Sequence, residues 1–319
     1  MTDTRFPHTR PGRMTSPGAY AGLLDTMPAD LPGAVRAGHG LLVHEHLTQV
    51  YGVTLTDADR ETVHLRPVEQ LLARIAERDD RPLDVPRPPE RRVAANCRHF
   101  TVLLVTALRT RGVPARARCG FGNYFGTGWH EDHWVAERWV AGSSGSDAGS
   151  GGSDAGSGGS DAGSGRRDAG SGRWVLTDGQ LDERQRELFG IEFDVLDVPR
   201  DRFVVAGDAW ARYRAGTLDP DRCGLSGVPE GGWWWIAGNL MRDAAALCGT
   251  ELLPWDCWGA MPEPADSLDD ERAALFDELA RLTLDPDTHA DELRRLTADA
   301  RLRLPPTVRN ALRHRPEPL

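Results

Sequence analysis

Three residues of this 319-residue chain have the side chains needed to attack an acyl group: Cys97, His133 and Asp178. Cys97 lies where a helix is predicted to begin, in the stretch NCRHFTVLLVTALRTRG. Unpaired backbone N–H groups and the positive end of the helix dipole stabilise a thiolate at such a position. A lone cysteine is nevertheless more often a small core residue than a nucleophile. The interpretation of Cys97 as a nucleophile therefore depends on the other two residues.

The pattern of predicted strands indicates that His133 and Asp178 could act together with Cys97. The stretches DHWVAERWV (132–140) and RWVLTD (173–178) alternate as half-buried strands do. In an antiparallel hairpin the start of the first strand lies beside the end of the second, on the same face in a straightforward register. His133 would then act as a general base, and Asp178 would orient its imidazole ring. The alternative for Asp178 is an acidic residue that begins a turn before Gly179.

The elements that must position Cys97 follow directly along the chain. Apolar residues at helical spacing predict a helix that starts at Cys97, ends at Gly112 and is buried on most sides. The stretch VPARARCGF (113–121) then alternates, which predicts a strand with Cys119 on its apolar face. We therefore interpret Cys119 as a core residue.

The flanking regions divide the chain into three expected parts. We expect a mobile N-terminal segment (1–30), in which Met14 is an alternative start to Met1, and a core over residues 31–215. A Trp-rich, helical C-terminal region (216–319) is expected to pack on this core and cover its cleft. Within these parts, amphipathic spacing predicts helices over residues 31–51, 66–80, 268–284 and 287–304. The three consecutive tryptophans at residues 233–235 could line a substrate pocket or pack in the core. We favour the core, because aromatic clusters mostly pack together.

A repeat separates the two strands that carry His133 and Asp178. The unit SDAGSGG starts at Ser146 and Ser153, and the same unit with a final arginine starts at Ser160. Because its largest apolar side chain is alanine, it cannot bury a core, and we expect a disordered insertion over residues 142–172. A long insertion in a hairpin costs little closure entropy. The alternative is a linker between domains, and the strand that restarts after the repeat argues against it.

The composition excludes several classes of function. The chain has 48 acidic and 38 basic residues and a net charge of −10, which does not favour nucleic-acid binding. All basic residues are arginine, so lysine-based Schiff-base chemistry within the chain is excluded. Five scattered cysteines without a CxxC pair do not form a disulfide framework. No apolar stretch predicts a signal peptide or a membrane span, and we expect a cytoplasmic protein.

The order of these segments resembles the transglutaminase-like superfamily. The resemblance covers residues 96 to about 182: NCRHF at the helix start, RGVPARARCGF, DHWVAERW and RWVLTDGQLD. It implies an α+β, papain-like core in which the nucleophile helix packs on an antiparallel sheet. It also implies Cys97 as nucleophile, His133 as general base and then acid, and Asp178 as orienting residue. The substrate would be a peptide, an amide or another acyl compound, attacked through a thioester intermediate. Hydrolysis and acyl transfer both remain open, and so does the oligomeric state.

The oxyanion donors are less well defined by the sequence. The backbone N–H of Cys97 is the natural donor at a helix start. The side-chain amide of Asn96 either contributes a second hydrogen bond or caps the helix, and the cap is favoured.

Three other interpretations remain beside the acyl-transfer hypothesis. A metal site would use His130, Asp132 and His133 with Cys97 or His99, but their spacing matches no common zinc motif. His99 is expected to point away from Cys97, at the surface or partly buried. A redox pair would join Cys97 to the distant Cys119. A binding module would keep the fold without catalysis. No cofactor and no metal are expected.

Overall fold

The computed structural model describes residues 6–142, 172–228 and 230–319, and the elements below lie within those ranges. The α-helices are α1 (Ala21–Leu24), α2 (Leu31–Leu41), α3 (Asp57–Arg60), α4 (Val68–Arg78), α5 (Cys97–Thr110), α6 (Glu183–Phe189), α7 (Ala206–Arg214), α8 (Trp233–Leu247), α9 (Asp270–Leu284) and α10 (Ala290–Thr297). The strands are β1 (Leu42–His44), β2 (Val93–Ala95), β3 (Ala115–Gly122), β4 (His130–Val140), β5 (Arg173–Thr177), β6 (Phe203–Val205), β7 (Cys223–Leu225), β8 (Glu230–Gly231), β9 (Asp256–Cys257), β10 (Thr307–Asn310) and β11 (Arg315–Pro318). The short 3-10 helices are η1 (Phe6–Thr9), η2 (Gly18–Tyr20), η3 (Thr48–Tyr51), η4 (Glu61–His64), η5 (Pro89–Arg91) and η6 (Pro220–Arg222).

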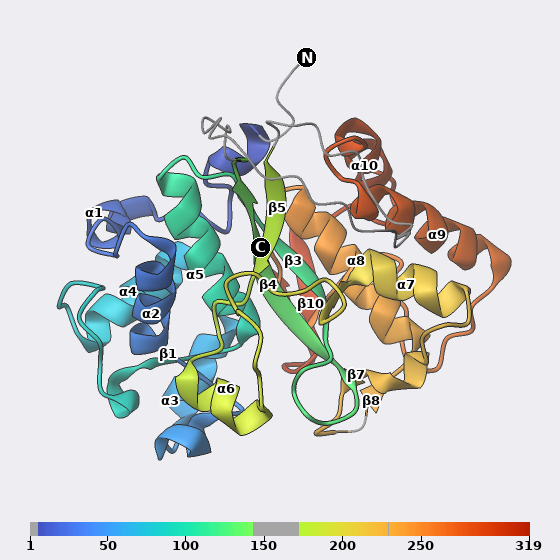
Figure 1. Cartoon of the computed structure of the whole chain (residues 1–319). Helices are drawn as coiled ribbons and strands as arrows, with labels where there is room; N and C mark the ends of the chain where they lie inside the picture. The colour runs from blue at the N-terminus through green and yellow to red at the C-terminus, as the bar shows by residue number, and fades with distance from the viewer. Residues whose placement is uncertain (1–5, 143–171, 229) are drawn as a thin grey trace, which may run out of the picture.

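The fold is α+β, with a central sheet between two groups of helices. Figure 1 shows α1, α2, α4 and α5 on one side of the long strands and α7 to α10 on the other. The sheet order is β6-β3-β4-β7-β8, and β5 also pairs with β4. The pairs β3–β4 and β4–β5 are antiparallel, whereas β4 and β7 run parallel. The strands around the site are antiparallel as expected, but the sheet as a whole is mixed, because the chain crosses through α7 before it returns as β7.

The elements around Cys97 agree with the sequence pattern. Helix α5 begins at Cys97 and ends at Thr110, and its side chains from Cys97 to Arg109 are buried. Strand β3 follows, with Cys119 fully buried among core residues. These results confirm the predicted helix, the predicted strand and the core position of Cys119.

Two predicted helices are too long. Helix α2 ends at Leu41, and the chain continues as β1, which pairs in parallel with β2. Leu42 and Val43 are fully buried opposite Val93 and Ala94, so tertiary pairing overrides the helical pattern there. The predicted helix over residues 287–304 is shortened to α10.

Both faces of strand β3 are covered, including the face that carries arginines. Arg116 pairs with Glu137 at 2.7 Å, and Arg118 pairs with Glu137 at 3.1 Å. On helix α8, Asp243 lies 2.8 Å from Arg118 and also accepts a hydrogen bond from the backbone N–H of Cys119 at 2.9 Å. All four charged side chains are buried, so the charges are compensated within the fold.

The expected boundary at residue 215 does not divide the structure. Strands β7 and β8 belong to the 216–319 region yet complete the central sheet, and α7 packs on α8 and α9. The described part of the segment expected to be mobile is also packed. Met14 is fully buried in the same apolar cluster as Trp210 and Phe276. The three expected parts are therefore interleaved in space.

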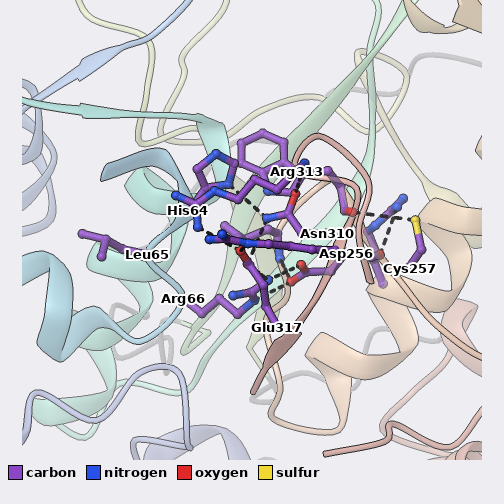
Figure 2. Close-up of polar contacts among 12 residues, drawn as sticks. His64, Leu65, Arg66, Asp256, Cys257, Asn310, Arg313 and Glu317 are labelled. Carbon is purple, nitrogen blue, oxygen red and sulfur yellow. Dashed lines mark hydrogen bonds and ion pairs between the residues drawn. The ribbon is translucent and has the colours of Figure 1, made fainter. Parts of the chain in front are cut away.

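A second, three-stranded sheet ties the C-terminal end of the chain to the region ahead of α4. Its order is β11-β10-β9. Figure 2 shows Arg66 facing this sheet, where it binds Asp256 through two hydrogen bonds of 2.9 and 2.6 Å and Glu317 at 2.9 Å. In the same cluster, the side-chain amide of Asn310 lies 3.1 Å from Nδ1 of His64. The neighbouring residue of Arg66, Leu65, lies beside helix α5.

The repeat lies outside the described residues. The strands on either side of it are paired up to Val140 and Arg173, so the chain leaves and re-enters the described structure at neighbouring positions. Within the described part of the chain, none of the helices has both the length and the apolar character that crossing a membrane requires.

Candidate active site

Cys97 occupies the first position of α5, directly after strand β2. Asn96 is the N-cap residue of the helix, with extended backbone angles. The thiol side chain is 6% exposed, so it lies close to the surface of the core. The backbone N–H of a first-turn residue has no partner within its own helix and is free to meet a negative charge.

His133 and Asp178 come together at the end of the β4–β5 hairpin. The last pair in the ladder joins Ala136 to Thr177, and Asp178 follows directly. Nε2 of His133 lies 2.8 Å from Oδ2 of Asp178. Both side chains are buried, so water competes little for this hydrogen bond.

Cys97 completes the arrangement on the other side of the imidazole ring. The thiol of Cys97 is among the groups that raise the pKa of the imidazole of His133, so the two side chains are neighbours. Because Asp178 occupies Nε2, the ring nitrogen left for Cys97 is Nδ1. The three residues that the sequence indicated therefore come together, with the imidazole bound to the carboxylate and influenced by the thiol.

The electrostatics of the pair favour an imidazolium beside a carboxylate. Burial opposes the charged ring, but the charge and hydrogen bond of Asp178 and the neighbouring Cys97 outweigh it and raise the pKa of His133 to about 10. Burial also opposes the charged form of Asp178, but the attraction of His133 lowers the pKa of this carboxyl. The fold thus stabilises opposite charges on the two side chains.

Tyr124 and Gln180 hold Asp178 in place, and sequence reasoning missed both. The hydroxyl of Tyr124 donates to Oδ2 of Asp178 at 2.8 Å, and the backbone N–H of Gln180 donates to Oδ1 at 3.0 Å. Tyr124 lies in the loop after β3, where no periodicity links it to Asp178. An N–H two residues after an aspartate is the usual Asx-turn donor, so the Gln180 contact had a local signal.

Aromatic rings enclose the imidazole of His133. The ring centroid of Phe125 lies 5.0 Å from that of His133, and those of Tyr124 and Phe203 lie at 6.0 and 6.2 Å. All three rings meet the imidazole edge-on. They restrict its rotation and keep water away from its bond to Asp178.

His99 is buried, which corrects the expectation of a surface or partly buried side chain. Its Nε2 donates to the backbone carbonyl of Leu65 at 2.9 Å. Its Nδ1 accepts from the backbone N–H of Asn96 at 3.3 Å and lies 2.9 Å from the side-chain amide of Asn96. Burial and the charge of Arg98 lower the pKa of His99 well below its usual value, so the ring is neutral. A packed neighbouring loop, rather than solvent, surrounds this face of α5.

Asn96 is therefore held at the start of α5 by His99. With its proton on Nε2, the His99 ring offers Nδ1 as an acceptor, so it is the amide nitrogen of Asn96 that can donate to this ring. Asn96 is the N-cap residue of α5, and its amide is occupied by the His99 ring.

The residues of the metal interpretation do not form a cluster of ligands in the described part of the chain. Oδ2 of Asp132 accepts a hydrogen bond from Nε1 of Trp235 at 2.7 Å. Within residues 6–142, 172–228 and 230–319, no group of three or more His, Cys, Asp or Glu side chains could hold a metal. Trp233 and Trp235 are partly buried and pack against the core cluster of α7, α8 and α9.

Comparisons with known proteins do not assign the chain to a family. No protein-family model matches it, and no match is found among curated proteins or among solved structures. A functional assignment therefore rests on the geometry of Cys97, His133 and Asp178.

Proposed function

We propose that this chain catalyses thiol-dependent acyl transfer or amide hydrolysis, with Cys97 as nucleophile, His133 as general base and acid, and Asp178 as orienting residue. The observation that carries the proposal is the imidazole of His133, which is held by Asp178 at 2.8 Å and has the thiol of Cys97 among the groups that raise its pKa. A helix N-terminus, an imidazole held by a carboxylate and a low-dielectric setting together favour a thiolate–imidazolium pair.

The first half of the reaction forms a thioester. Sγ of Cys97 attacks the carbonyl carbon of a peptide, amide or related acyl compound, and the carbonyl oxygen takes the negative charge. When this tetrahedral intermediate collapses, the carbon–nitrogen bond breaks and Nδ1 of His133 gives its proton to the leaving amine. Asp178 keeps Nε2 protonated and stabilises the charged ring.

The second half releases the acyl group. Water or an amine attacks the thioester carbon, and Nδ1 of His133 accepts the proton of the attacking group. The carbon–sulfur bond then breaks, and Cys97 returns as a thiolate beside the imidazolium. Water gives hydrolysis and an amine gives transfer. A lysine amine from this chain is excluded as the acceptor because the sequence contains no lysine.

The order of elements supports a transglutaminase-like arrangement. Helix α5 carries the nucleophile and packs on β3 and β4, β4 carries the histidine, and the aspartate follows β5. We propose this class for the chain from that order together with the sequence resemblance.

Alkylation of Cys97 tests the proposal. Iodoacetamide labelling is followed by peptide mass spectrometry from about pH 5 to 9 in the wild type, in His133→Ala and in Cys119→Ala. The wild type and Cys119→Ala should be labelled at Cys97 well below pH 8.5, the region where free thiols begin to react, and His133→Ala should lose this reactivity.

The opposite result supports the binding module instead. Labelling that rises only near pH 8.5 in the wild type, with no change in His133→Ala, would show an ordinary thiol. A fold that binds without catalysis would then be the better interpretation.

A further inference from the structure

His44 lies beside the segment that leads into Cys97. Strands β1 and β2 are parallel, and His44 is the register partner of Ala95, two residues before the nucleophile. The next backbone N–H, that of Glu45, donates to the carbonyl of Ala95 at 2.8 Å. Neighbouring strands are about 4.8 Å apart, so the backbone of His44 runs alongside the entry to α5.

The imidazole of His44 is also close to the other two triad residues. Burial and the charges of His46 and His133 lower the pKa of His44 to about 3, while the Asp178 carboxylate partly opposes this effect. The charge of His44 acts on His99 as well, which lies at the third position of α5. Together with the strand register beside Ala95, these interactions place the imidazole of His44 near His133 and Asp178 at the start of α5.

The hydrogen bonds of His44 assign the position of its proton. The backbone N–H of His46 donates to Nδ1 of His44 at 3.3 Å, so Nδ1 is an acceptor. The proton of the neutral ring is therefore on Nε2. Within the described residues the ring hydrogen bond of His44 is made at Nδ1, and the residue is half-buried, so Nε2–H is left to meet a substrate.

We propose that Nε2–H of His44 donates a hydrogen bond to the oxygen of the acyl group that Cys97 attacks. It would act as a second donor beside the backbone N–H of Cys97. A neutral imidazole suits this role, because it donates a hydrogen bond to the developing oxyanion without transferring its proton in the ground state. The assignment rests on the proposed function, and it makes His44 a catalytic residue supplied by a strand far from the helix in sequence.

Two reactions of Cys97 separate this role from others. Acylation by p-nitrophenyl acetate passes through an oxyanion, whereas alkylation by iodoacetamide does not. His44→Ala should slow the release of p-nitrophenol about 100-fold and leave the alkylation rate within about twofold of the wild type. His44→Gln, which keeps an N–H donor of similar reach, should recover part of the lost rate.

His46→Ala is the matched control, because it removes a neighbouring exposed imidazole and keeps the backbone N–H that orients His44. Its acylation rate should stay within about twofold of the wild type. Near-UV circular dichroism of each variant checks that the fold is kept.

The outcomes distinguish the two proposals. Wild-type acylation with an unchanged rate in His44→Ala overturns the assignment of His44 and leaves the proposed function intact. Equal loss of acylation and alkylation in a folded His44→Ala would show that His44 acts on the thiolate, which also overturns the oxyanion role. A wild type acylated no faster than Cys97→Ala would contradict the proposed function, and with it the role of His44.

Discussion

The chemistry of the site depends on which atoms of each side chain already take part in hydrogen bonds. Asp178 holds Nε2 of His133 and is itself held by Tyr124 and by the backbone of Gln180. These contacts leave Nδ1 of His133 for Cys97. A carboxylate with three hydrogen-bond donors keeps a fixed direction, so the imidazole that it binds is fixed as well.

Asp178→Asn should make the stability of the protein depend less on pH. The raised pKa of His133 stabilises the wild type fully below about pH 6.5, and this contribution is lost as the pH rises towards about 10. The lowered pKa of Asp178 adds stability above about pH 4, which is lost as the pH falls below it. The difference in the free energy of unfolding between the wild type and Asp178→Asn should therefore be largest from about pH 4 to 6.5.

Urea unfolding of both proteins at several pH values measures this difference. The difference between the urea midpoints of the wild type and Asp178→Asn should decrease steadily between about pH 6.5 and 10. A gap that stays constant over this range would show that His133 and Asp178 do not form a charged pair in the folded state.

At the scale of elements, helix α8 is joined to the sheet by a buried ion pair. Asp243 of α8 binds the guanidinium of Arg118 and the backbone N–H of Cys119 on β3. Arg118 is also paired with Glu137 of β4, so one buried cation joins three elements. Loss of one carboxylate leaves part of this cation uncompensated away from water.

Asp243→Asn should lower the free energy of unfolding by about 3–5 kcal/mol, because it breaks a buried pair without removing its cation. Glu77→Gln is the control, because Glu77 forms an exposed ion pair with Arg74 on α4. The side chain of Glu77 is 60% exposed and that of Arg74 is 46% exposed. That change should cost at most about 1 kcal/mol. Urea unfolding checks both values, and similar losses in the two variants would contradict a specific role of the buried pair.

At the scale of the whole molecule, the N-terminal and C-terminal parts of the chain build one structure. Met14 packs into the apolar cluster formed by the later helices, and β7 and β8 extend the sheet that carries His133. The sheet of β9, β10 and β11 is anchored to Arg66 by Asp256 and Glu317. Burial of these contacts favours unfolding as one cooperative unit.

Replacement of residues 146–172 by a short turn should leave the fold and the reactivity of Cys97 intact. Val140 and Arg173 are paired at the open end of the hairpin, so a short connection can join the two strands. A shorter loop also slightly reduces the entropic cost of bringing the ends of the two strands together. Thermal unfolding and iodoacetamide labelling of the shortened chain check this expectation, and loss of folding would show that the repeat contributes to the structure.

The sequence by itself determined the local elements around the candidate site. Helical spacing after Cys97 and alternation around His133 and Asp178 depend only on neighbouring residues, so α5, β3, β4 and β5 could be predicted. The antiparallel hairpin followed from those strands. The end of α2 could not be predicted, because pairing of β1 with β2 overrides its helical pattern.

Only the tertiary structure decided the contacts between distant residues. The hydroxyl of Tyr124 reaches Asp178 across 54 positions, and β1 brings His44 beside the start of α5. His99 is buried because the Leu65 loop covers its face of the helix. Periodicity assigns a residue to a face, but the element that covers that face is chosen by the packing of the whole chain.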